Sequence, residues 1–267
     1  MPFLKLGDVD LHYTVTGSGP PFLFLAATAW HGRLWHLEQV PEFSRDHQVI
    51  TFDQRGTGLS VTKSRDFSTK RLADDAAALL EHLGVREAIV CGHSNGGRVA
   101  QQLTVDHPEL VGTLILASAG GTHGGGGIGI KMIVELVEKG YAPYVREFAL
   151  HTGCSKAYYA AHRDQVEAFL DKRMEDLPPL DVFLGHVLGR QESDTTSRIG
   201  EITVPTLVMV GDDEDHGTGI THFEFAKRHA AGITGAKLVI FPGEGHYYPF
   251  LSPEPTHKAM RAFLASR

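Results

Sequence analysis

The feature that most constrains the fold of this chain is the segment Gly92-His93-Ser94-Asn95-Gly96, in which one serine stands between two glycines. An apolar, β-branched run over 88–90 precedes it, and a pattern typical of a helix over 97–106 follows it. On its own, the five-residue pattern also fits a glycine-rich turn. A chain that reverses sharply at the serine needs positions without a Cβ two residues to either side, because a side chain there would collide with the neighbouring backbone. The context therefore predicts a tight turn from strand to helix, with the Ser94 hydroxyl exposed at its tip.

The composition is that of a soluble globular protein. Of 267 residues, 42% are hydrophobic and 21% are charged, which suits one domain, with or without an inserted subdomain. The formal net charge is −7 without a long run of either sign, which argues against nucleic acid or an anionic membrane as the main partner. The N-terminal residues lack the features of a signal peptide, and no apolar stretch has the length of a membrane span. We therefore expect a cytoplasmic protein without a disulfide, whose oligomeric state stays open, a homodimer being one alternative.

Apolar runs and helical patterns alternate along most of the chain. Because strands that alternate with helices require right-handed crossovers, this order predicts an α/β fold with a mostly parallel, eight-stranded sheet flanked by helices. The first two strands are expected to form an antiparallel entry to the sheet. The expected strands are 3–6, 11–16, 21–25, 49–52, 88–91, 110–117, 204–210 and 237–241, and the expected helices are 68–83, 97–106, 222–231 and 253–265, with a short helix within 35–43.

The alternation lapses between about 118 and 202, where helical patterns follow one another without a strand. We interpret this segment as an inserted helical cap. The chain then divides into a first core part over 1–118, a cap over 119–202 and a second core part over 203–267. Glycines within 120–129 satisfy the G-x-G-x-x-G pattern, but no acidic residue follows at the expected ribose position, so we expect a hinge and no dinucleotide cofactor. The cap helices are expected over 130–139, 157–174 and 179–188.

Partners for Ser94 follow two late strands. A serine hydroxyl is a weak nucleophile at neutral pH, so it needs a base within hydrogen-bond reach and a carboxylate that orients the base. The acidic run Asp212-Asp213-Glu214-Asp215 follows the strand over 204–210, and His246 follows the strand over 237–241 in a tight Gly-Glu-Gly-His loop. Open α/β sheets place their sites at the carboxyl ends of such strands. We therefore predict Ser94 as the nucleophile and His246 as its base.

Together, these motifs resemble those of cap-bearing serine hydrolases of the α/β-hydrolase fold. The resemblance covers nearly the whole chain outside the cap. The Asp-Gln-Arg-Gly form of one motif resembles proline iminopeptidases, whereas the serine turn and the shorter chain look more like esterases, lactonases and carbon–carbon bond hydrolases. The motifs are Asp53-Gln54-Arg55-Gly56-Thr57-Gly58-Leu59-Ser60, the turn around Ser94, Pro205-Thr206 before a strand ending in Gly211, and Gly245-His246.

The resemblance implies where the acid lies. Members of the family usually carry it three residues after the glycine that ends the strand, which is Glu214 here, where aspartate is commoner. Glutamate can accept the imidazole N–H as aspartate does. A one-residue insertion would instead give the role to Asp215.

The resemblance also implies an oxyanion hole made of the backbone N–H groups of Asn95 and Thr28. Relatives normally have His-Gly in the loop after the early strand, and this chain has Ala26-Ala27 there. Backbone donors survive such a change of side chain. His31-Gly32 is an alternative that comes later after the strand.

Further charged and aromatic residues are expected to have structural or cap roles. We expect Asp53 and Arg55 to form a buried, turn-fixing ion pair, and Arg98 and Asp106 to be structural. The aromatic and histidine side chains of the cap are expected to close over the site. These cap residues are His151, Tyr158, Tyr159, Phe169, Phe183 and His186.

The resemblance implies hydrolysis of a small carboxylic ester or lactone through an acyl-enzyme on Ser94, with a small-molecule substrate and neither cofactor nor metal. Two alternatives stay open. The same triad could serve a carbon–carbon bond hydrolase or a proline iminopeptidase-like peptidase, and an acidic cap residue able to bind a free amine would favour the peptidase. Outside catalysis, the fold also serves as a ligand receptor.

Overall fold

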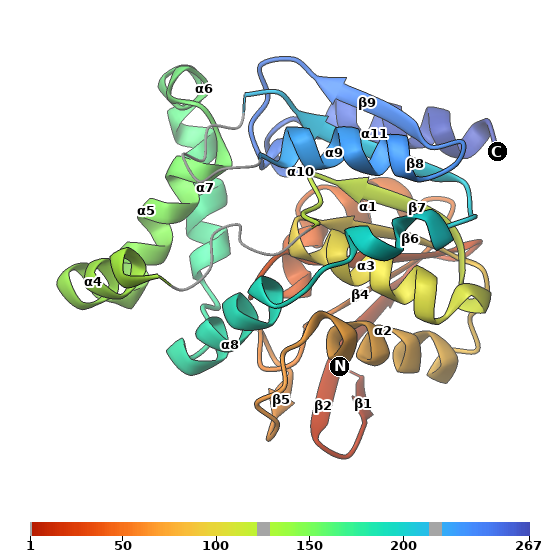
Figure 1. The fold of residues 1–267 in the computed structure, drawn as a ribbon, viewed down its shortest axis with the longest axis horizontal. Helices are drawn as coiled ribbons and strands as arrows, with labels where there is room; N and C mark the ends of the chain where they lie inside the picture. The colour runs from red at the N-terminus through yellow and green to blue at the C-terminus, as the bar shows by residue number, and fades with distance from the viewer. Residues whose placement is uncertain (1, 122–128, 214–220) are drawn as a thin grey trace.

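The computed structural model describes residues 2–121, 129–213 and 221–267. In this part of the chain a nine-stranded sheet has the order β1-β2-β4-β3-β6-β7-β8-β9, with β5 paired to β2 (Figure 1). All eight predicted strands are present, and β5 is an addition whose two residues are too few to show a periodic pattern. The strands are β1 (Phe3–Lys5), β2 (Val9–Thr16), β3 (Pro21–Leu25), β4 (Gln48–Phe52), β5 (Val61–Thr62), β6 (Ala88–His93), β7 (Val111–Ala117), β8 (Thr206–Gly211) and β9 (Lys237–Phe241).

The sheet is mostly parallel. From β4 through β3, β6, β7 and β8 to β9 each neighbouring pair is parallel, whereas β1 and β2 run antiparallel to their neighbours. The predicted mostly parallel sheet with an antiparallel entry is confirmed. In such a sheet the carboxyl ends of the parallel strands meet at one edge. The loops after β3, β6, β8 and β9 therefore lie near one another.

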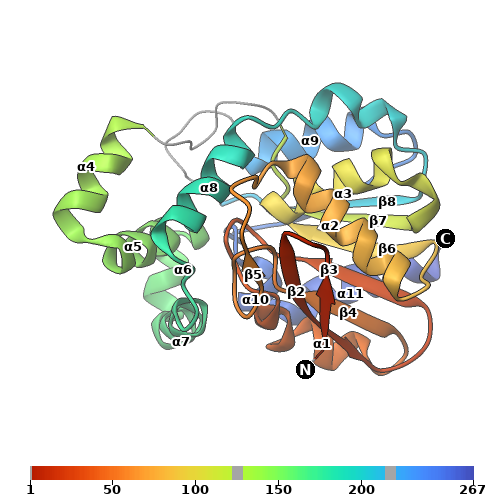
Figure 2. The ribbon, with the colours of Figure 1, turned by 90° about the horizontal axis from the view of Figure 1, so that it is seen from below.

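Helices cover both faces of the sheet (Figure 2). In β3, Leu23 and Leu25 pack into the layer with α2 and α3, whereas Phe22 and Phe24 belong to the opposite layer, where the ring centroids of Phe22 and Phe43 are 5.1 Å apart. A strand with apolar side chains on both faces needs such cover on both sides. One layer holds α2 (Thr69–His82), α3 (Asn95–Asp106), η2 (Pro108–Leu110), η3 (Thr196–Glu201) and α9 (His222–Gly232), and the other holds η1 (Gly32–His36), α1 (Gln39–Phe43), α10 (Tyr248–Leu251) and α11 (Pro253–Ala265).

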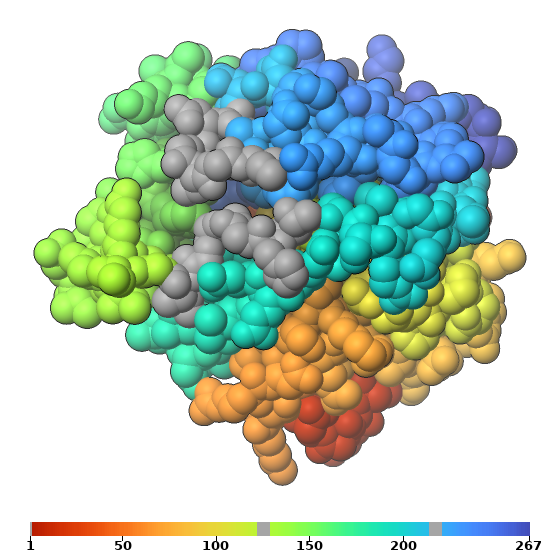
Figure 3. All heavy atoms as spheres, viewed as in Figure 1, coloured from red at the N-terminus to blue at the C-terminus, as the bar shows by residue number. Residues whose placement is uncertain are grey.

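A run of helices, α4 to α8, separates β7 from β8. They lie together at one side of the sheet, and their green and teal surface adjoins the core in the space-filling view (Figures 1 and 3). The predicted helix over 157–174 is two helices, because the backbone of His162 leaves helical geometry with φ −129° and ψ 34°. The sequence pattern does not predict α5, which carries Pro143 in its first turn, where proline is tolerated. The helices are α4 (Ile130–Lys139), α5 (Tyr141–Gly153), α6 (Lys156–Ala161), α7 (Arg163–Met174) and α8 (Leu180–Gln191).

Membrane crossing needs a long apolar helix, and none of the helices that the structure describes is long and apolar enough.

The loop after β4 is fixed by two buried charge clusters. The fully buried Arg55 guanidinium donates to both carboxylate oxygens of Asp75, at 2.7 and 2.8 Å, and to Asp8 at 3.1 Å. The Asp53 carboxylate instead lies 2.9 Å from Nδ1 of His12 and accepts the N–H of Gly32 at 2.7 Å. The predicted ion pair between Asp53 and Arg55 is therefore wrong, because each has its own partners, although both residues are buried and structural.

Helix α8 is attached to this loop through His186. Its Nε2 donates to the carbonyl oxygen of Arg55 at 3.0 Å, and its ring lies 4.9 Å from that of Phe67. The side chain is fully buried. Burial lowers the pKa of His186 to about 4, because a charged imidazolium would lose its hydration.

The depressed pKa predicts a pH-dependent stability. In the unfolded chain a histidine binds a proton near pH 6.5, whereas folded His186 stays neutral down to about pH 4. Its contribution to stability is therefore complete above about pH 6.5 and is lost as the pH falls toward 4. Between pH 7 and 4.5 we expect His186 to account for about 2 kcal/mol of the fall in unfolding free energy.

Urea denaturation at both pH values measures this contribution. His186→Gln keeps an N–H donor but does not titrate, so its unfolding free energy should fall by about 2 kcal/mol less than that of the wild type. His162→Gln, at an exposed position, is the control and should behave like the wild type. The same pH dependence in the wild type and in His186→Gln would contradict the assignment.

Candidate active site

Ser94 lies at the turn between β6 and α3, as predicted. Its backbone has φ 56° and ψ −116°, a conformation that residues other than glycine rarely adopt. Hydrogen bonds hold it there: the Ser94 N–H donates to the carbonyl of Ala117 at 2.9 Å, and the Ser94 carbonyl accepts the N–H of Gly97 at 3.1 Å. Strained backbone held in this way is concentrated at functional sites.

The glycines of the turn occupy positions where a side chain would not fit. A Cβ on Gly92 would overlap the carbonyl of Gly96, and a Cβ on Gly96 would overlap the carbonyl of Leu25 at the end of β3. A Cβ on Gly97 would overlap Ala119. The steric reason for the G-x-S-x-G spacing is therefore present in this chain, and the predicted tight turn is confirmed.

His246 lies in the loop after β9 and lines the same cavity as Ser94. Nε2 of His93 lies 2.9 Å from the carbonyl oxygen of His246, so the residue before Ser94 holds the backbone of the histidine. The His246 ring stacks on that of His222, with centroids 4.2 Å apart, and lies 4.7 Å from that of His93. The preceding position, 245, needs glycine, because a Cβ there would come within 2.7 Å of the Gly153 carbonyl oxygen.

The acidic run after β8 is described in part. The Asp212 carboxylate accepts the N–H of Gly243 at 2.7 Å, and the Asp213 N–H donates to the carbonyl of Glu244 at 3.0 Å. These contacts join the end of β8 to the loop that carries His246. Glu214 and Asp215, the predicted acid and its alternative, lie outside the described residues.

Thr28 and Asn95, the predicted oxyanion donors, both line the cavity with Ser94. Asn95 is the first residue of α3, where backbone N–H groups have no intrahelical acceptor. Nη1 of Arg190 donates to the Thr28 hydroxyl at 3.3 Å.

The loop around Thr28 is held by its own backbone contacts. Gln54 donates to the carbonyl of Ala26 at 2.9 Å, and the Trp30 N–H donates to the carbonyl of Ala27 at 3.1 Å. Ala26-Ala27 therefore forms an ordered loop without the His-Gly of relatives. The alternative His31-Gly32 lies elsewhere: the Gly32 N–H donates to Asp53, and neither residue is among the described residues that line the cavity.

Ser94 and His246 open into a cavity of about 560 Å³. Of the six cap residues expected to close over the site, His151 and Phe183 line it. The others have different roles; the hydroxyl of Tyr158, for example, donates to the carbonyl of Leu251. The described lining residues are Ala27, Thr28, Trp30, Ser94, Asn95, Arg98, Gly120, Gly129, Lys131, Met132, Glu135, Lys139, Tyr144, Glu147, Phe148, His151, Thr152, Arg173, Phe183, Val187, Arg190, His222, Phe225, His246 and Tyr247.

Sequence reasoning missed three arginines of this cavity. Arg98 lies one helical turn after Ser94 and lines the cavity. Its hydrogen bond to the carbonyl of Arg190 at 3.0 Å agrees with the predicted structural role, and Asp106, which pairs with Arg198 at 2.7 Å, is structural as predicted. Arg173 on α7 and Arg190 on α8 also line the cavity. No motif contains them, because only the folded helices determine which side chains turn inward.

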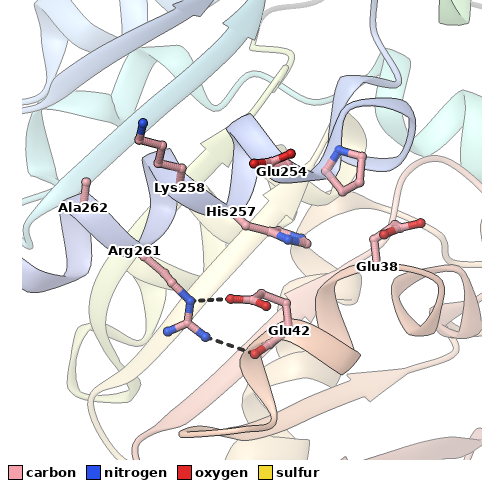
Figure 4. Close-up of a pocket in the computed structure, with 8 residues that line it drawn as sticks. Glu38, Glu42, Glu254, His257, Lys258, Arg261 and Ala262 are labelled. Atoms are coloured by element: carbon pink, nitrogen blue, oxygen red, sulfur yellow. Dashed lines mark hydrogen bonds and ion pairs between the residues drawn. The ribbon is translucent and has the colours of Figure 1, made fainter.

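A second hollow lies at the surface between α1 and α11 and measures about 710 Å³ (Figure 4). Arg261 donates to Glu42 at 2.5 Å and to Asp46 at 2.9 Å, which ties the two helices together. The pKa of Asp46 is lowered to about 2, chiefly by its hydrogen bond with Arg261. None of the described residues around this hollow belongs to the predicted triad, so we interpret it as a structural contact.

Comparison with known proteins identifies the family. The model described as the alpha/beta hydrolase family matches residues 22–259. Over 114 residues the chain is 40% identical to a Mycobacterium tuberculosis protein provisionally named non-heme bromoperoxidase BpoC, a match that spans 42% of this chain and 43% of that protein. It is 25% identical to 3-oxoadipate enol-lactonase 2 of Acinetobacter baylyi, over 86% of this chain and 85% of the relative.

Solved structures share the whole fold. Est816, described as an N-acyl homoserine lactone degrading enzyme, is 26% identical and superposes with a TM-score of 0.79, covering 98% of this chain and 100% of that one. The strand order and the serine turn after β6 are those expected of the α/β-hydrolase fold, and the family model matches residues 22–259. This chain belongs to the alpha/beta hydrolase family.

Proposed function

We propose that this protein is a serine hydrolase that cleaves a small carboxylic ester or lactone through an acyl-enzyme on Ser94. The observation that carries the proposal is the placement of a strained serine and His246 in one cavity at the carboxyl edge of the sheet. The bond class is supported by two similar proteins whose names state lactone chemistry, the enol-lactonase and Est816.

The proposed reaction begins when His246 takes the Ser94 proton as Oγ attacks the carbonyl carbon of the substrate. The N–H groups of Asn95 and Thr28 stabilise the negative oxygen of the tetrahedral intermediate. His246 then donates the proton to the leaving alkoxide, and the acyl group stays on Ser94. Water, deprotonated by His246, attacks this ester, and His246 returns the proton to Ser94 Oγ as the acid is released. Glu214, with Asp215 as the alternative, orients His246 in this scheme.

The helical segment over 119–202 is proposed to act as a cap, because side chains from α4, α5, α7 and α8 line the cavity. In this account it selects the small-molecule substrate. The scheme requires neither a metal nor a cofactor, since nucleophile, base and oxyanion donors all come from the chain. The cytoplasmic location and the lack of a nucleic-acid or membrane partner stay predictions.

One observation favours the peptidase alternative. Glu135 and Glu147 of the helical segment line the cavity and could bind a free amine. Glu147 is paired with Lys139 at 2.7 Å, however, and three arginines share the lining. These cations disfavour a positively charged substrate, so the ester or lactone is our first choice. Turnover of proline p-nitroanilide without turnover of esters would reverse that choice.

Replacement of the nucleophile tests the proposal. Ser94→Ala should lower the turnover of short p-nitrophenyl esters by about 10⁴-fold or more, because the variant loses the hydroxyl that forms the acyl-enzyme in the proposed scheme. Labelling by a fluorophosphonate, read by intact-protein mass spectrometry, should disappear with it. Ser197→Ala, at an exposed position of η3, is the control and should keep both. Labelling that persists in Ser94→Ala, or a folded wild type inert to all acyl esters, would contradict the proposal.

A second comparison assigns the acid. Glu214→Gln should lower kcat by about 10³- to 10⁴-fold, because the imidazole loses the carboxylate that fixes its tautomer. Asp215→Asn should stay within a few-fold of the wild type. The reverse result would assign the role to Asp215, and small effects of both would contradict either assignment.

A further inference from the structure

Arg173 is a buried cation without a carboxylate partner in the part of the chain that the structure describes. Its side chain lies on α7, is 7% exposed and lines the cavity of Ser94. Its Cζ lies 5.3 Å from the centre of the Trp30 ring, and its Nη1 lies 3.5 Å from the Met174 sulfur. Its buried Nε has no hydrogen-bond acceptor among the described residues.

Neighbouring acids on the same segment are already engaged. Asp171 pairs with Arg146 at 2.8 Å, Glu175 pairs with Lys172 at 2.7 Å, and Asp176 pairs with Arg33. None of these carboxylates is an ion-pair partner of Arg173. Within the described residues, the surface cations of this region are thus paired, whereas the cation inside the cavity has no carboxylate partner.

Such a placement is costly unless something compensates the charge. Burial lowers the pKa of the Arg173 guanidinium, and the nearby hydroxyls of Tyr247 and Tyr141 partly offset this effect. A guanidinium nevertheless keeps its proton in proteins. Buried charges are normally paired, because the loss of hydration is otherwise uncompensated. A bound anion would supply the missing partner.

The rest of the cavity lining also carries a net positive charge. Although the whole chain has a formal charge of −7, the described lining carries five basic and two acidic side chains. Two of the bases lie close together: Arg98 donates to the carbonyl of Arg190 at 3.0 Å, and Arg190 donates to the Thr28 hydroxyl. Cationic walls of low dielectric concentrate anionic ligands.

Arg173 contacts residues that neighbour the proposed reaction centre in the sequence. Its contact Trp30 lies two residues after Thr28, and Tyr247, whose hydroxyl lies beside it, follows His246 directly. A planar guanidinium with several N–H donors suits a carboxylate, which it can bind with two hydrogen bonds. A small molecule could therefore reach Ser94 with one group and Arg173 with another.

We propose that the substrate carries a carboxylate in addition to the ester or lactone bond, and that Arg173 binds this carboxylate. This inference rests on the proposed hydrolysis at Ser94. It makes Arg173 a specificity-determining residue and the substrate class an anionic ester or lactone of small size.

The test compares matched pairs of substrates. p-Nitrophenyl hydrogen glutarate carries the charge on the acyl side, and its methyl ester is the neutral partner. 4-Acetoxybenzoate carries it on the leaving group, and methyl 4-acetoxybenzoate is its neutral partner. We expect the wild type to prefer the anionic member of at least one pair by about tenfold or more in kcat/KM, and Arg173→Gln to reduce that ratio to near one.

Lys172→Gln is the matched control, because it removes the same charge one residue earlier from an exposed side chain that does not line the cavity. It should keep the wild-type ratio. Binding is measured separately as the shift in melting temperature caused by glutarate and by uncharged glutaramide. Glutarate alone should stabilise the wild type, and this effect should be lost in Arg173→Gln.

The outcomes separate the two proposals. Ester hydrolysis without a preference in either pair, and without stabilisation by glutarate, would overturn the carboxylate site and leave the hydrolase intact. Stabilisation by glutarate that depends on Arg173, without turnover of any ester, would support the site and overturn the hydrolase. If Arg173→Gln does not fold, the absence of both preference and stabilisation in the wild type still overturns the inference.

Discussion

The site depends on the close approach of three backbone segments at the turn after β6, those at Leu25, Gly92 and Gly96. The carbonyl of Leu25 occupies the space of a side chain on Gly96, and the carbonyl of Gly96 occupies that of one on Gly92. Only glycines permit this contact. It forces Ser94 into the left-handed region and starts α3 directly beside the end of β3. The N–H of Asn95 and the loop that carries Thr28 thereby reach the same cavity.

The other elements of the site are attached to this turn. His93, inside the turn, holds the carbonyl of His246, so the loop after β9 is positioned from the serine side. Arg55 fixes the loop after β4, and its carbonyl accepts a hydrogen bond from His186 of α8. The helices between β7 and β8 are therefore attached to the same core that carries Ser94. The arginines of the cavity come mainly from those helices, so in our proposal substrate selection resides on an element separate from the chemistry.

The sequence predicts most of the fold because the relevant signals are local. Buried strands give apolar runs, and helices with clear ends, such as α4 and α11, are predicted with the bounds that the structure has. The turn at Ser94 is predictable because its steric requirement fixes the spacing of the glycines. By contrast, β5 is too short for a pattern, and the break at His162 depends on one residue's backbone.

The arginines of the cavity are not predicted from the sequence, because their position depends on tertiary packing. Arg98, Arg173 and Arg190 become neighbours of one cavity only through the packing of α3, α7 and α8. Nothing in their local sequence distinguishes them from the arginines that form surface ion pairs. The pairing of Asp53 with His12, 41 positions apart, has the same cause. Motifs thus locate the proposed reaction centre of this chain, whereas the side chains proposed to select the substrate are brought together by tertiary contacts.

The most direct measurement is a crystal structure of the protein after reaction with a p-nitrophenyl alkylphosphonate that carries a terminal carboxylate. Our account predicts phosphorus bonded to Ser94 Oγ and a phosphonyl oxygen about 2.7–3.1 Å from the N–H nitrogens of Asn95 and Thr28. The carboxylate should accept hydrogen bonds from the guanidinium of Arg173. Phosphorus on another side chain, or an oxygen turned away from both N–H groups, would contradict the account.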